Sequence, residues 1–289
     1  MTEFIVQTIN GLTLAGVVFL VSSGFTLIFG VMRVTSLMHG AVFLLGGYVA
    51  YSVIGALHNF FWGLAAGTVA MGVLGLLVER GLLPLLRRSD MAELLATLGL
   101  VYVIDDVSLA IWGGNPLNIT LPGVLNGSTA LPFSGIVYPN GRFFILGVSV
   151  VVAAGLWVLL RRTRVGAIVR AGVDDRDMVS ALGINVRRVF SAVFLLGTAL
   201  AGFAGVIGVP IVGLAPGNDT TILLLALAVV VIGGLGSYEG ALLGSVIIAL
   251  ADVYGTAYFP QVSYSVLFIP LVVVLLVRPQ GLLGRRAAV

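Results

Sequence analysis

Long apolar runs separated by short polar breaks make up most of this 289-residue chain. A helix rises about 1.5 Å per residue, so about 20 apolar residues cross the hydrocarbon core of a membrane. The pattern predicts nine spans, at residues 4–31, 39–57, 60–79, 91–112, 142–160, 189–212, 221–235, 240–258 and 263–277. Residues 221–258 could instead form one re-entrant element, which would leave eight spans. The predicted fold is a single all-α membrane domain over residues 1–289, with eight or nine transmembrane helices and interrupted or re-entrant segments.

The composition agrees with a membrane protein and excludes several kinds of chemistry. Apolar residues make up 59% of the chain and charged residues 9%, whereas a soluble domain is about 25% charged. All 15 basic residues are arginine, so there is no lysine for the phosphates of a P-loop ATPase or for a Schiff base. The absence of cysteine excludes disulfides and thiolate metal sites. Nothing in the charge pattern suggests nucleic acid, and we expect this chain to bind no metal or other cofactor.

The arginines predict how the spans are oriented, because Lys and Arg are enriched in short cytoplasmic loops. If the N-terminus is outside, all of the arginines except Arg142 fall on the cytoplasmic side. The sequence therefore predicts an external N-terminus and a cytoplasmic C-terminus. It also predicts an extracytoplasmic loop at 113–141, which contains several Gly and Pro residues and no charge.

Two stretches, 29–51 and 230–253, have the pattern of interrupted helices. In each, a glycine-containing polar break leads into a helix start, His39-Gly40-Ala41 in one and Glu239-Gly240-Ala241 in the other. Irregular backbone persists in a membrane only where it is buried in protein or lines a cavity, and interrupted helices at corresponding positions point to a transport pathway. The similarity suggests an internal repeat. The candidate pathway residues from the two stretches are Ser36, Met38, His39, Gly40, Gly234, Gly236, Glu239 and Gly240.

The candidates for functional ionisable groups inside the predicted spans are Asp105, Asp106, Asp252 and His39. A charge at the membrane centre costs roughly 2.5–3.5 kcal/mol by insertion scales and usually marks function. The neighbours Asp105 and Asp106 could line a pathway, or could hold the bundle together through Arg33 or hydroxyl groups. A structural role is the simpler interpretation of Asp252, which lies nearer a helix end. His39 is expected to be a buried, hydrogen-bonded residue, because a metal site would need further ligands nearby.

Residues 161–188 hold seven of the 15 arginines and three of the 12 acids. Asp174 and Asp175 are placed as in the first turn of a short helix, and Gly183 would end it. The apolar residues at helical spacing on one face are Met178, Ala181 and Leu182. The pattern predicts a short amphipathic helix on the cytoplasmic face. It could pack on its own bundle or lie on lipid, but mixed charge around a small apolar patch suits a protein partner better.

This loop resembles the coupling segment of LivH-type permeases of bacterial branched-chain amino acid ABC transporters. The family pattern is approximately R-x-G-x-x-x-R-A-x-x-x-D, then an Ala-rich helix and L-G-I. Further similarities extend over nearly the whole chain: "FGVMRV" and "HG" near residue 40, "LLATLGL" at 94–100, "GGLGSYEGALLGS" and the ending "RPQGLLGR". The loop residues through which ATPase coupling is expected, from this resemblance and from the helix pattern, are Arg164, Gly166, Arg170, Ala171, Asp174, Asp175, Met178, Ala181, Leu182, Gly183 and Ile184.

The resemblance implies a permease subunit of a binding-protein-dependent ABC importer, a transporter component rather than an enzyme. Such a permease pairs with a second homologous permease and two cytoplasmic ATPases, and receives substrate from an extracytoplasmic binding protein. ATP and Mg²⁺ would bind the ATPase subunits. The permease would be a multi-pass protein of the bacterial inner membrane, in contact with its lipid, and would move branched-chain amino acids or related small polar molecules inward by alternating access.

Two departures from the family pattern bear on the substrate. Where the family commonly reads I-N-F-A-H-G, this chain has Ser36 for the asparagine and Met38 for the alanine. Where the family often has Q-N in the fourth span, this chain has Asp105 and Asp106. If these positions line the pathway, carboxylates would suit a solute with a cationic or strongly donating group, such as an amine or a urea-like compound.

Two other classes of function compete with the importer. An ion-coupled secondary transporter or channel could use the same broken helices and aspartates, but it would not need a docking loop at 161–188. An intramembrane hydrolase would need two carboxylates that share a proton at close range, and neighbours on one helix do not have that geometry. The sequence therefore favours the ABC permease.

Overall fold

The computed structural model describes residues 2–32, 36–86, 89–130, 137–174 and 176–284 of the protein. Within them lie seven helices that are long and apolar enough to cross a membrane and two shorter apolar helices. The long helices are α1 (Thr2–Met32), α2 (His39–Leu57), α3 (Phe60–Leu77), α5 (Asp90–Trp112), α6 (Asn140–Arg162), α9 (Val186–Val212) and α11 (Tyr238–Tyr258). The shorter ones are α10 (Asn218–Gly233) and α12 (Ser263–Val277). The nine helices correspond to the nine predicted apolar runs, and this confirms the predicted polytopic helical fold.

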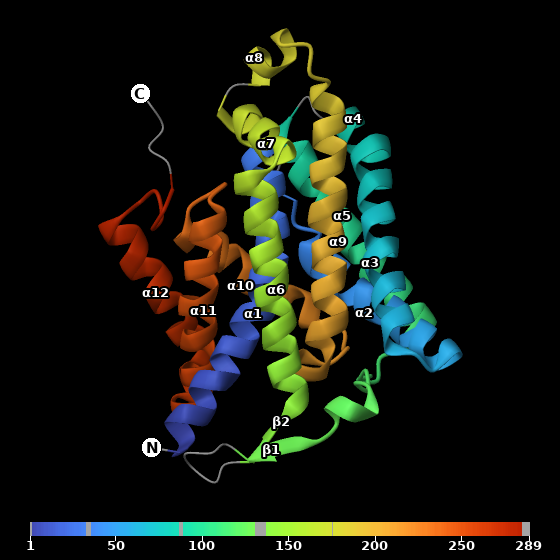
Figure 1. The fold of residues 1–289 in the computed structure, drawn as a ribbon, viewed down its shortest axis with the longest axis vertical. Helices are drawn as coiled ribbons and strands as arrows, with labels where there is room; N and C mark the ends of the chain where they lie inside the picture. The colour runs from blue at the N-terminus through green and yellow to red at the C-terminus, as the bar shows by residue number, and fades with distance from the viewer. Residues whose placement is uncertain (1, 33–35, 87–88, 131–136, 175, 285–289) are drawn as a thin grey trace.

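The two ends of the bundle carry different elements (Figure 1). The N-terminus and the strands β1 (Ser128–Ala130) and β2 (Val137–Pro139) lie at one end, which we call the hairpin end. The short helices α4 (Leu83–Leu86), α7 (Arg164–Asp174) and α8 (Arg176–Ala181) lie at the other, together with the C-terminal segment, and we call this the arginine-rich end. The separation agrees with the predicted placement of loops, since Arg142 begins α6 at the hairpin end.

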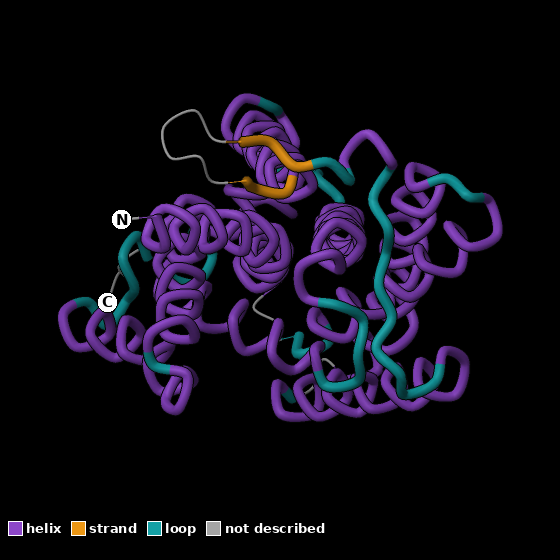
Figure 2. The backbone as a smooth tube through the Cα atoms, turned by 90° about the horizontal axis from the view of Figure 1, so that it is seen from below, coloured by secondary structure: helices purple, strands orange, loops and turns teal. Residues whose placement is uncertain are grey.

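Two short strands supplement the helices of the all-α fold. They pair antiparallel, with Thr129 opposite Tyr138. Thr129 Oγ1 also donates a hydrogen bond of 2.6 Å to Asn140 Oδ1 at the start of α6. Figure 2, which looks onto the hairpin end, shows the strands beside the end of a helix and irregular connections across the other helix ends. Only a few residues pair, so the strands are too short to produce an alternating apolar pattern that would predict them from the sequence.

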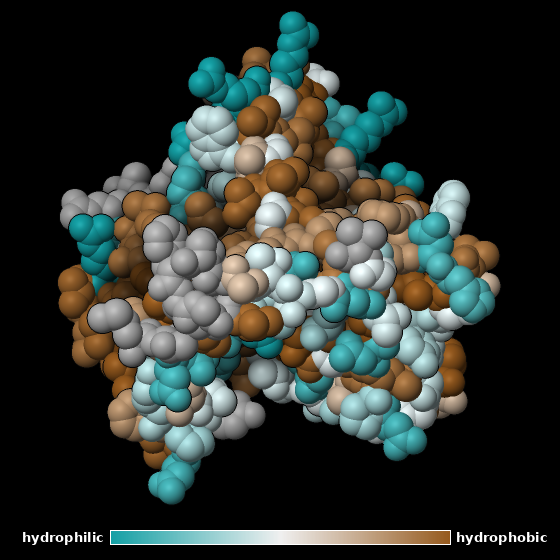
Figure 3. All heavy atoms as spheres, turned by 60° about the horizontal axis from the view of Figure 1, so that its bottom comes forward, coloured by the Kyte–Doolittle hydropathy of each residue, from teal (hydrophilic) through white to brown (hydrophobic). Residues whose placement is uncertain are grey.

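Helices α1 and α9 form the centre of the bundle. In their apolar spans 83% and 72% of the residues are buried, whereas the share is 22% in both α5 and α6. α1 packs on α9 and α11, and α9 also packs on α2 and α3. The outer helices turn large apolar side chains outward, for example Val151 of α6, which is 71% exposed. In Figure 3, hydrophobic residues cover much of the flank, while paler and hydrophilic residues gather on the hairpin end.

The central helices approach one another through glycine. A Cβ on Gly205 of α9 would collide with the carbonyl oxygen of Phe43 in α2, and one on Gly24 of α1 would collide with the carbonyl oxygen of Gly197. Likewise, a Cβ on Gly67 of α3 would lie 2.6 Å from the carbonyl oxygen of Gly46. Small residues permit this close packing, which is a main source of helix association in lipid. These glycines are therefore the points at which the central helices touch.

Helices α2 and α10 meet at their N-termini. The loop after α9 turns back into the bundle, and its Leu214 lies against Gly47 of α2 and forms a β-bridge with Leu117. α10 then begins where the α-carbon of Gly40 lies against the carbonyl oxygen of Asp219. From this point the two helices run to opposite ends of the bundle. The sequence pattern paired α2 with α11 as a repeat, but in space the counterpart of α2 at this junction is α10.

The C-terminal segment covers the end of α10. The backbone N–H groups of Leu282 and Leu283 donate to the carbonyls of Ile232 and Gly233 at 2.7 and 3.1 Å. Gly234 has φ of 96° and Gly281 has φ of 81°, and the two backbones lie against each other. A helix end in a membrane protein must have its carbonyls satisfied. The Gly-Leu-Leu of the segment "RPQGLLGR" satisfies these carbonyls, and this explains why the segment is a distinct sequence feature.

We predict that Gly205→Val destabilises the bundle by about 1–3 kcal/mol, because the new side chain forces α9 away from the Phe43 carbonyl. The matched control is Gly147→Val in α6, where no atom lies within 4 Å of the added Cβ. The measurement is the melting temperature of the detergent-purified chain. Equal melting temperatures for the two variants would contradict the packing assigned to Gly205.

Candidate functional site

A buried polar cluster surrounds the junction of α2 and α10. Ser36, His39 and Asp219 are at most 2% exposed. The Nδ1 atom of His39 lies 3.3 Å from the carbonyl oxygen of Ser36, and its ring packs edge-on against Phe25. Among the described residues, no hydrogen-bond partner is found for Ser36 Oγ, His39 Nε2 or Asp219 Oδ1. Buried polar groups normally have partners, so this cluster has the properties of a site rather than of packing.

The cluster lies beside α5. The backbone N–H of Leu37 donates to Thr97 Oγ1 of α5 at 3.4 Å, and Trp112 of α5 stacks on Tyr48 of α2 with ring centroids 5.0 Å apart. Asp105 of α5 is close enough to Asp219 for their carboxylates to interact electrostatically. The neighbouring Asp106 points elsewhere and is exposed on the outer face of α5. The structure therefore brings Asp105, but not Asp106, toward the cluster at the α2–α10 junction.

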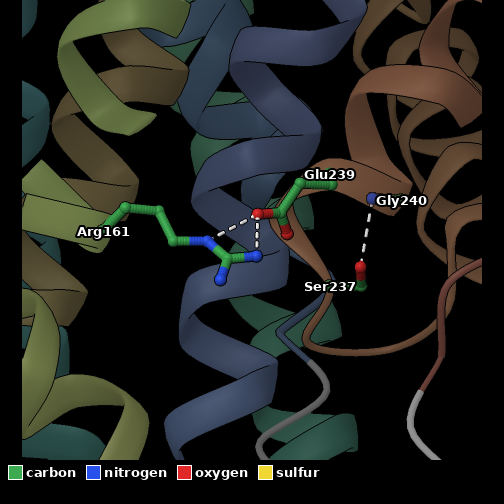
Figure 4. Close-up of polar contacts among 4 residues, drawn as sticks. All are labelled: Arg161, Ser237, Glu239 and Gly240. Carbon is green, nitrogen blue, oxygen red and sulfur yellow. Dashed lines mark hydrogen bonds and ion pairs between the residues drawn. The ribbon is translucent and has the colours of Figure 1, made fainter. Parts of the chain in front are cut away.

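The second predicted group of pathway residues lies far from this junction, at the arginine-rich end. Gly236 and Glu239 line a cavity of about 420 Å³ there, together with Thr26 of α1 and Arg170 of α7. The Arg161 guanidinium donates through Nε to Glu239 Oε1 at 2.8 Å and also through Nη2, which makes an ion pair between α6 and α11 (Figure 4). Ser237 Oγ accepts from the N–H of Gly240 and caps α11.

The other two glycines of this group have packing roles. Gly234 lies against the C-terminal segment, and Gly240 lies against the backbone of Gly233. The predicted set thus separates into residues at the buried junction, residues around the arginine-end cavity, and glycines that let backbones meet. Arg170, expected as a coupling residue, shares its cavity with Gly236 and Glu239, so the structure joins two regions that the sequence presented separately.

The segment 161–188 contains two short helices, not one. α7 follows α6 after Thr163, whose Oγ1 accepts from the N–H of Gly166 at 3.2 Å. Asp174 is the last residue of α7 and not part of a first helical turn, so that expectation was wrong: helix continues from Arg164 because Thr163 caps it earlier. Asp175 lies outside the described residues.

The predicted apolar patch is present on α8. Met178 is 57% exposed and Leu182 is 72% exposed, with Ala181 exposed between them, whereas Val179 is buried and anchors the helix. Gly183, with φ of 79°, ends the helix as predicted, and the N–H of Ile184 donates to Val179 at 3.4 Å. The patch therefore lies on α8 and the turn that follows it, and Val179 is the buried anchor among the described side chains of this helix. Figure 1 shows α8 as the outermost element of that end.

A third region is a cavity of about 620 Å³ at the hairpin end, between the end of α2, the start of α3 and the loop that contains Asn118. Asn59 caps α3 by accepting from the N–H groups of Phe61 and Trp62. Among the described residues, no group of three His, Cys, Asp or Glu side chains could hold a metal ion.

Comparison with known proteins identifies the family. Residues 7–277 match the family model described as the permease component of branched-chain amino acid transport systems. The chain belongs to this family.

Among the relatives of this permease are the LivH permease protein of the high-affinity branched-chain amino acid transport system of Escherichia coli K12 and the BraD permease protein of Pseudomonas aeruginosa. They are 30% and 28% identical to it, and each alignment covers 98% of this chain and 96% of the relative. The ribose import permease RbsC of Escherichia coli K12 is 28% identical over 82% of this chain and 74% of its own length.

Sequence reasoning missed Asp219 of this permease. The predicted span began at residue 221, which left Asp219 in a loop, whereas it is the second residue of α10 and 2% exposed. It is the only acid between residues 178 and 238, and this isolation in an apolar region could have marked it as a candidate site residue. A second missed residue is Glu79, which is 1% exposed and accepts from Ser191 Oγ at 2.6 Å. Glu79 was missed because the residues that follow it, Arg80 and Gly81, are typical of a loop rather than of a buried core.

We predict that Gly166→Ala displaces α7 from α6, because an added Cβ would collide with the carbonyl oxygens of Leu159 and Leu160. The expected result is faster trypsin cleavage after Arg164 and Arg170 in the purified permease. Gly172→Ala in the same helix is the matched control, since no atom lies within 4 Å of its Cβ. Unchanged cleavage of the Gly166 variant would show that the α6–α7 junction tolerates a side chain.

Proposed function

We propose that this chain is the transmembrane permease subunit of a binding-protein-dependent ABC importer that moves branched-chain amino acids or related small polar molecules inward. The observation that carries the proposal is the α7–α8 segment, which projects from the bundle and exposes Met178 and Leu182. A lysine-free chain cannot contain a Walker A site, so ATP and Mg²⁺ bind two partner ATPases. The arginine-rich end is cytoplasmic by the positive-inside rule, and the membrane is the bacterial inner membrane.

The ATPases dock on the α7–α8 segment. An apolar patch edged with charge is typical of a protein interface. The movement of a docked ATPase has a direct route into the bundle, because α7 borders the cavity that Glu239 lines and Arg161 joins α6 to α11. The ion pair itself is exposed on both sides and contributes little to stability. Its role in the proposed mechanism is to keep the start of α11 in register with the docking segment during alternating access.

The second permease subunit covers the outer face of α5. Asp106 lies within this span and is exposed in the single chain, beside the exposed side chains of Tyr102 and Val103. A carboxylate inside a membrane faces a bundle interior or a water-filled cavity rather than lipid. We infer that α5 faces a homologous permease across the translocation pathway, with Asp106 in that pathway and Asp105 directed toward the α2–α10 junction. The binding protein delivers substrate at the hairpin end.

The substrate is an amino acid or a related small polar molecule. The family and the LivH-like relatives support this class, and the aspartate pair supports a solute with an ammonium or similar donor. Helix N-termini favour negative charge, and two of them meet at Gly40 and Asp219. An α-amino acid offers a carboxylate to the helix ends and an ammonium to Asp105, while Asp106 lies farther along the same pathway.

We predict that Met178→Asp combined with Leu182→Asp abolishes docking of the ATPases. Charge on the patch would have to be desolvated in the interface, at a cost of several kcal/mol. The chain would be co-expressed with its candidate ATPases and second permease, and copurification and binding-protein-stimulated ATP hydrolysis would be measured. The control is Met178→Leu combined with Leu182→Met, which keeps the patch apolar and should retain docking. Uptake by the wild-type chain alone, driven by an ion gradient, would instead favour a secondary transporter.

We predict that Asp105→Gln combined with Asp106→Asn changes substrate selection rather than assembly. The neutral pair should lower uptake of ammonium-bearing solutes about tenfold or more, because a charge-assisted hydrogen bond contributes about 1.5–3 kcal/mol. Uptake would be measured in proteoliposomes with the complete complex, and ATPase copurification serves as the assembly control. Unchanged uptake of every solute tested would remove these aspartates from the pathway.

A further inference from the structure

Two opposite charges that the proposed pathway does not use line one small cavity near the hairpin end. The cavity has a volume of about 270 Å³ and lies between α1, α6, α9 and α11. Its charged lining residues are Arg142, the first arginine of α6, and Asp252 in α11. The polar side chains around them are those of Gln7, Asn10, Thr13 and Thr256.

The arginine is held in place from one side. Asn10 Oδ1 accepts from Arg142 Nη1 and also from Tyr138 OH at 2.6 Å, and the guanidinium carbon lies 5.7 Å from the centre of the Tyr138 ring. Asn10 in turn donates through Nδ2 to Gln7 Oε1 at 3.2 Å. These contacts orient Arg142 but leave its charge without a carboxylate partner among the described residues.

The aspartate has no partner at all among the described residues. Asp252 is half-buried, two turns before the end of α11, and forms no hydrogen bond or ion pair there. An uncompensated carboxylate within a membrane span is costly, and such residues usually mark a binding site. Arg142 lines the same cavity, yet the two side chains do not pair with each other. A ligand that bears both charges would compensate both residues at once.

We propose that this cavity binds a small zwitterion, with the anionic group on Arg142 and a primary ammonium on Asp252. Arginine binds carboxylate and phosphate through paired N–H donors, and a carboxylate accepts from the ammonium. The shared chemistry is an ammonium a few bonds from an anion, as in a free amino acid or a phosphoethanolamine headgroup of a lipid. The site lies apart from the α2–α10 junction and does not depend on the proposed importer function.

The test measures binding to the detergent-purified full chain by calorimetry, with two pairs of probes. Short-chain phosphatidylethanolamine is compared with phosphatidylglycerol of the same chain length, and L-leucine with 4-methylpentanoic acid, which lacks the ammonium. At least one ammonium-bearing probe should bind about tenfold more tightly than its partner. Selection of the lipid identifies a headgroup site, and selection of leucine identifies a site for the free solute. If neither ammonium-bearing probe binds more tightly than its partner, the proposal is wrong.

Variants locate the binding. Asp252→Asn should remove the preference for the ammonium, and Arg142→Gln should weaken the selected probe about tenfold. Glu3→Gln is the matched control, because it neutralises an exposed carboxylate of α1 that does not line this cavity, and it should leave binding unchanged. If Asp252→Asn does not fold, Thr256→Phe narrows the cavity without altering either charge and should also weaken binding. If the cavity variants still bind the ammonium-bearing probe more tightly than its partner, the zwitterion binds elsewhere and the assignment is wrong.

Discussion

Contact between helix backbones through glycine is the interaction on which the rest of this structure depends. In lipid there is no hydrophobic drive to hold apolar helices together, so association relies on close packing. Gly24 against Gly197 joins α1 to α9, and Gly205 against Phe43 joins α9 to α2. These contacts fix the position of α2, and with it the place where its N-terminus meets α10. Because these contacts hold the helices in place, Ser36, His39 and Asp219 stay buried at this junction.

Irregular backbone inside the bundle follows from the same packing. The loop after α9 can turn back because Leu214 and Leu117 satisfy each other's backbone groups at 2.8 and 2.9 Å. The C-terminal segment satisfies the carbonyls at the far end of α10. Both of these breaks are therefore compensated by another segment of the chain. This permits two helix N-termini inside the bundle, a geometry that favours anions where continuous helices would offer only apolar side chains.

The arrangement also connects the proposed docking surface with the interior. α7 leaves α6 after one residue, borders the cavity of Glu239, and continues to the exposed patch of α8. Arg161 at the end of α6 holds the start of α11. A displacement at α8 would thus reach α6, α11 and the region beside Thr26 of α1 through directly packed elements. Among the described residues of α8, the buried side chain that anchors the helix is that of Val179.

The sequence by itself determined the class of fold, the apolar spans, the family and the exposed patch at Met178 and Leu182. These follow from local properties: hydrophobic length, arginine distribution and helical spacing, which are the same wherever the helix lies. The tertiary structure alone decided which polar residues meet. Asp219 lies against Gly40, Arg170 shares a cavity with Glu239, and Arg142 shares another with Asp252, across separations of 69 to 179 residues that no spacing rule connects. Proximity depends on how glycine contacts set the helices beside one another, and that is a property of the packed bundle rather than of any one segment.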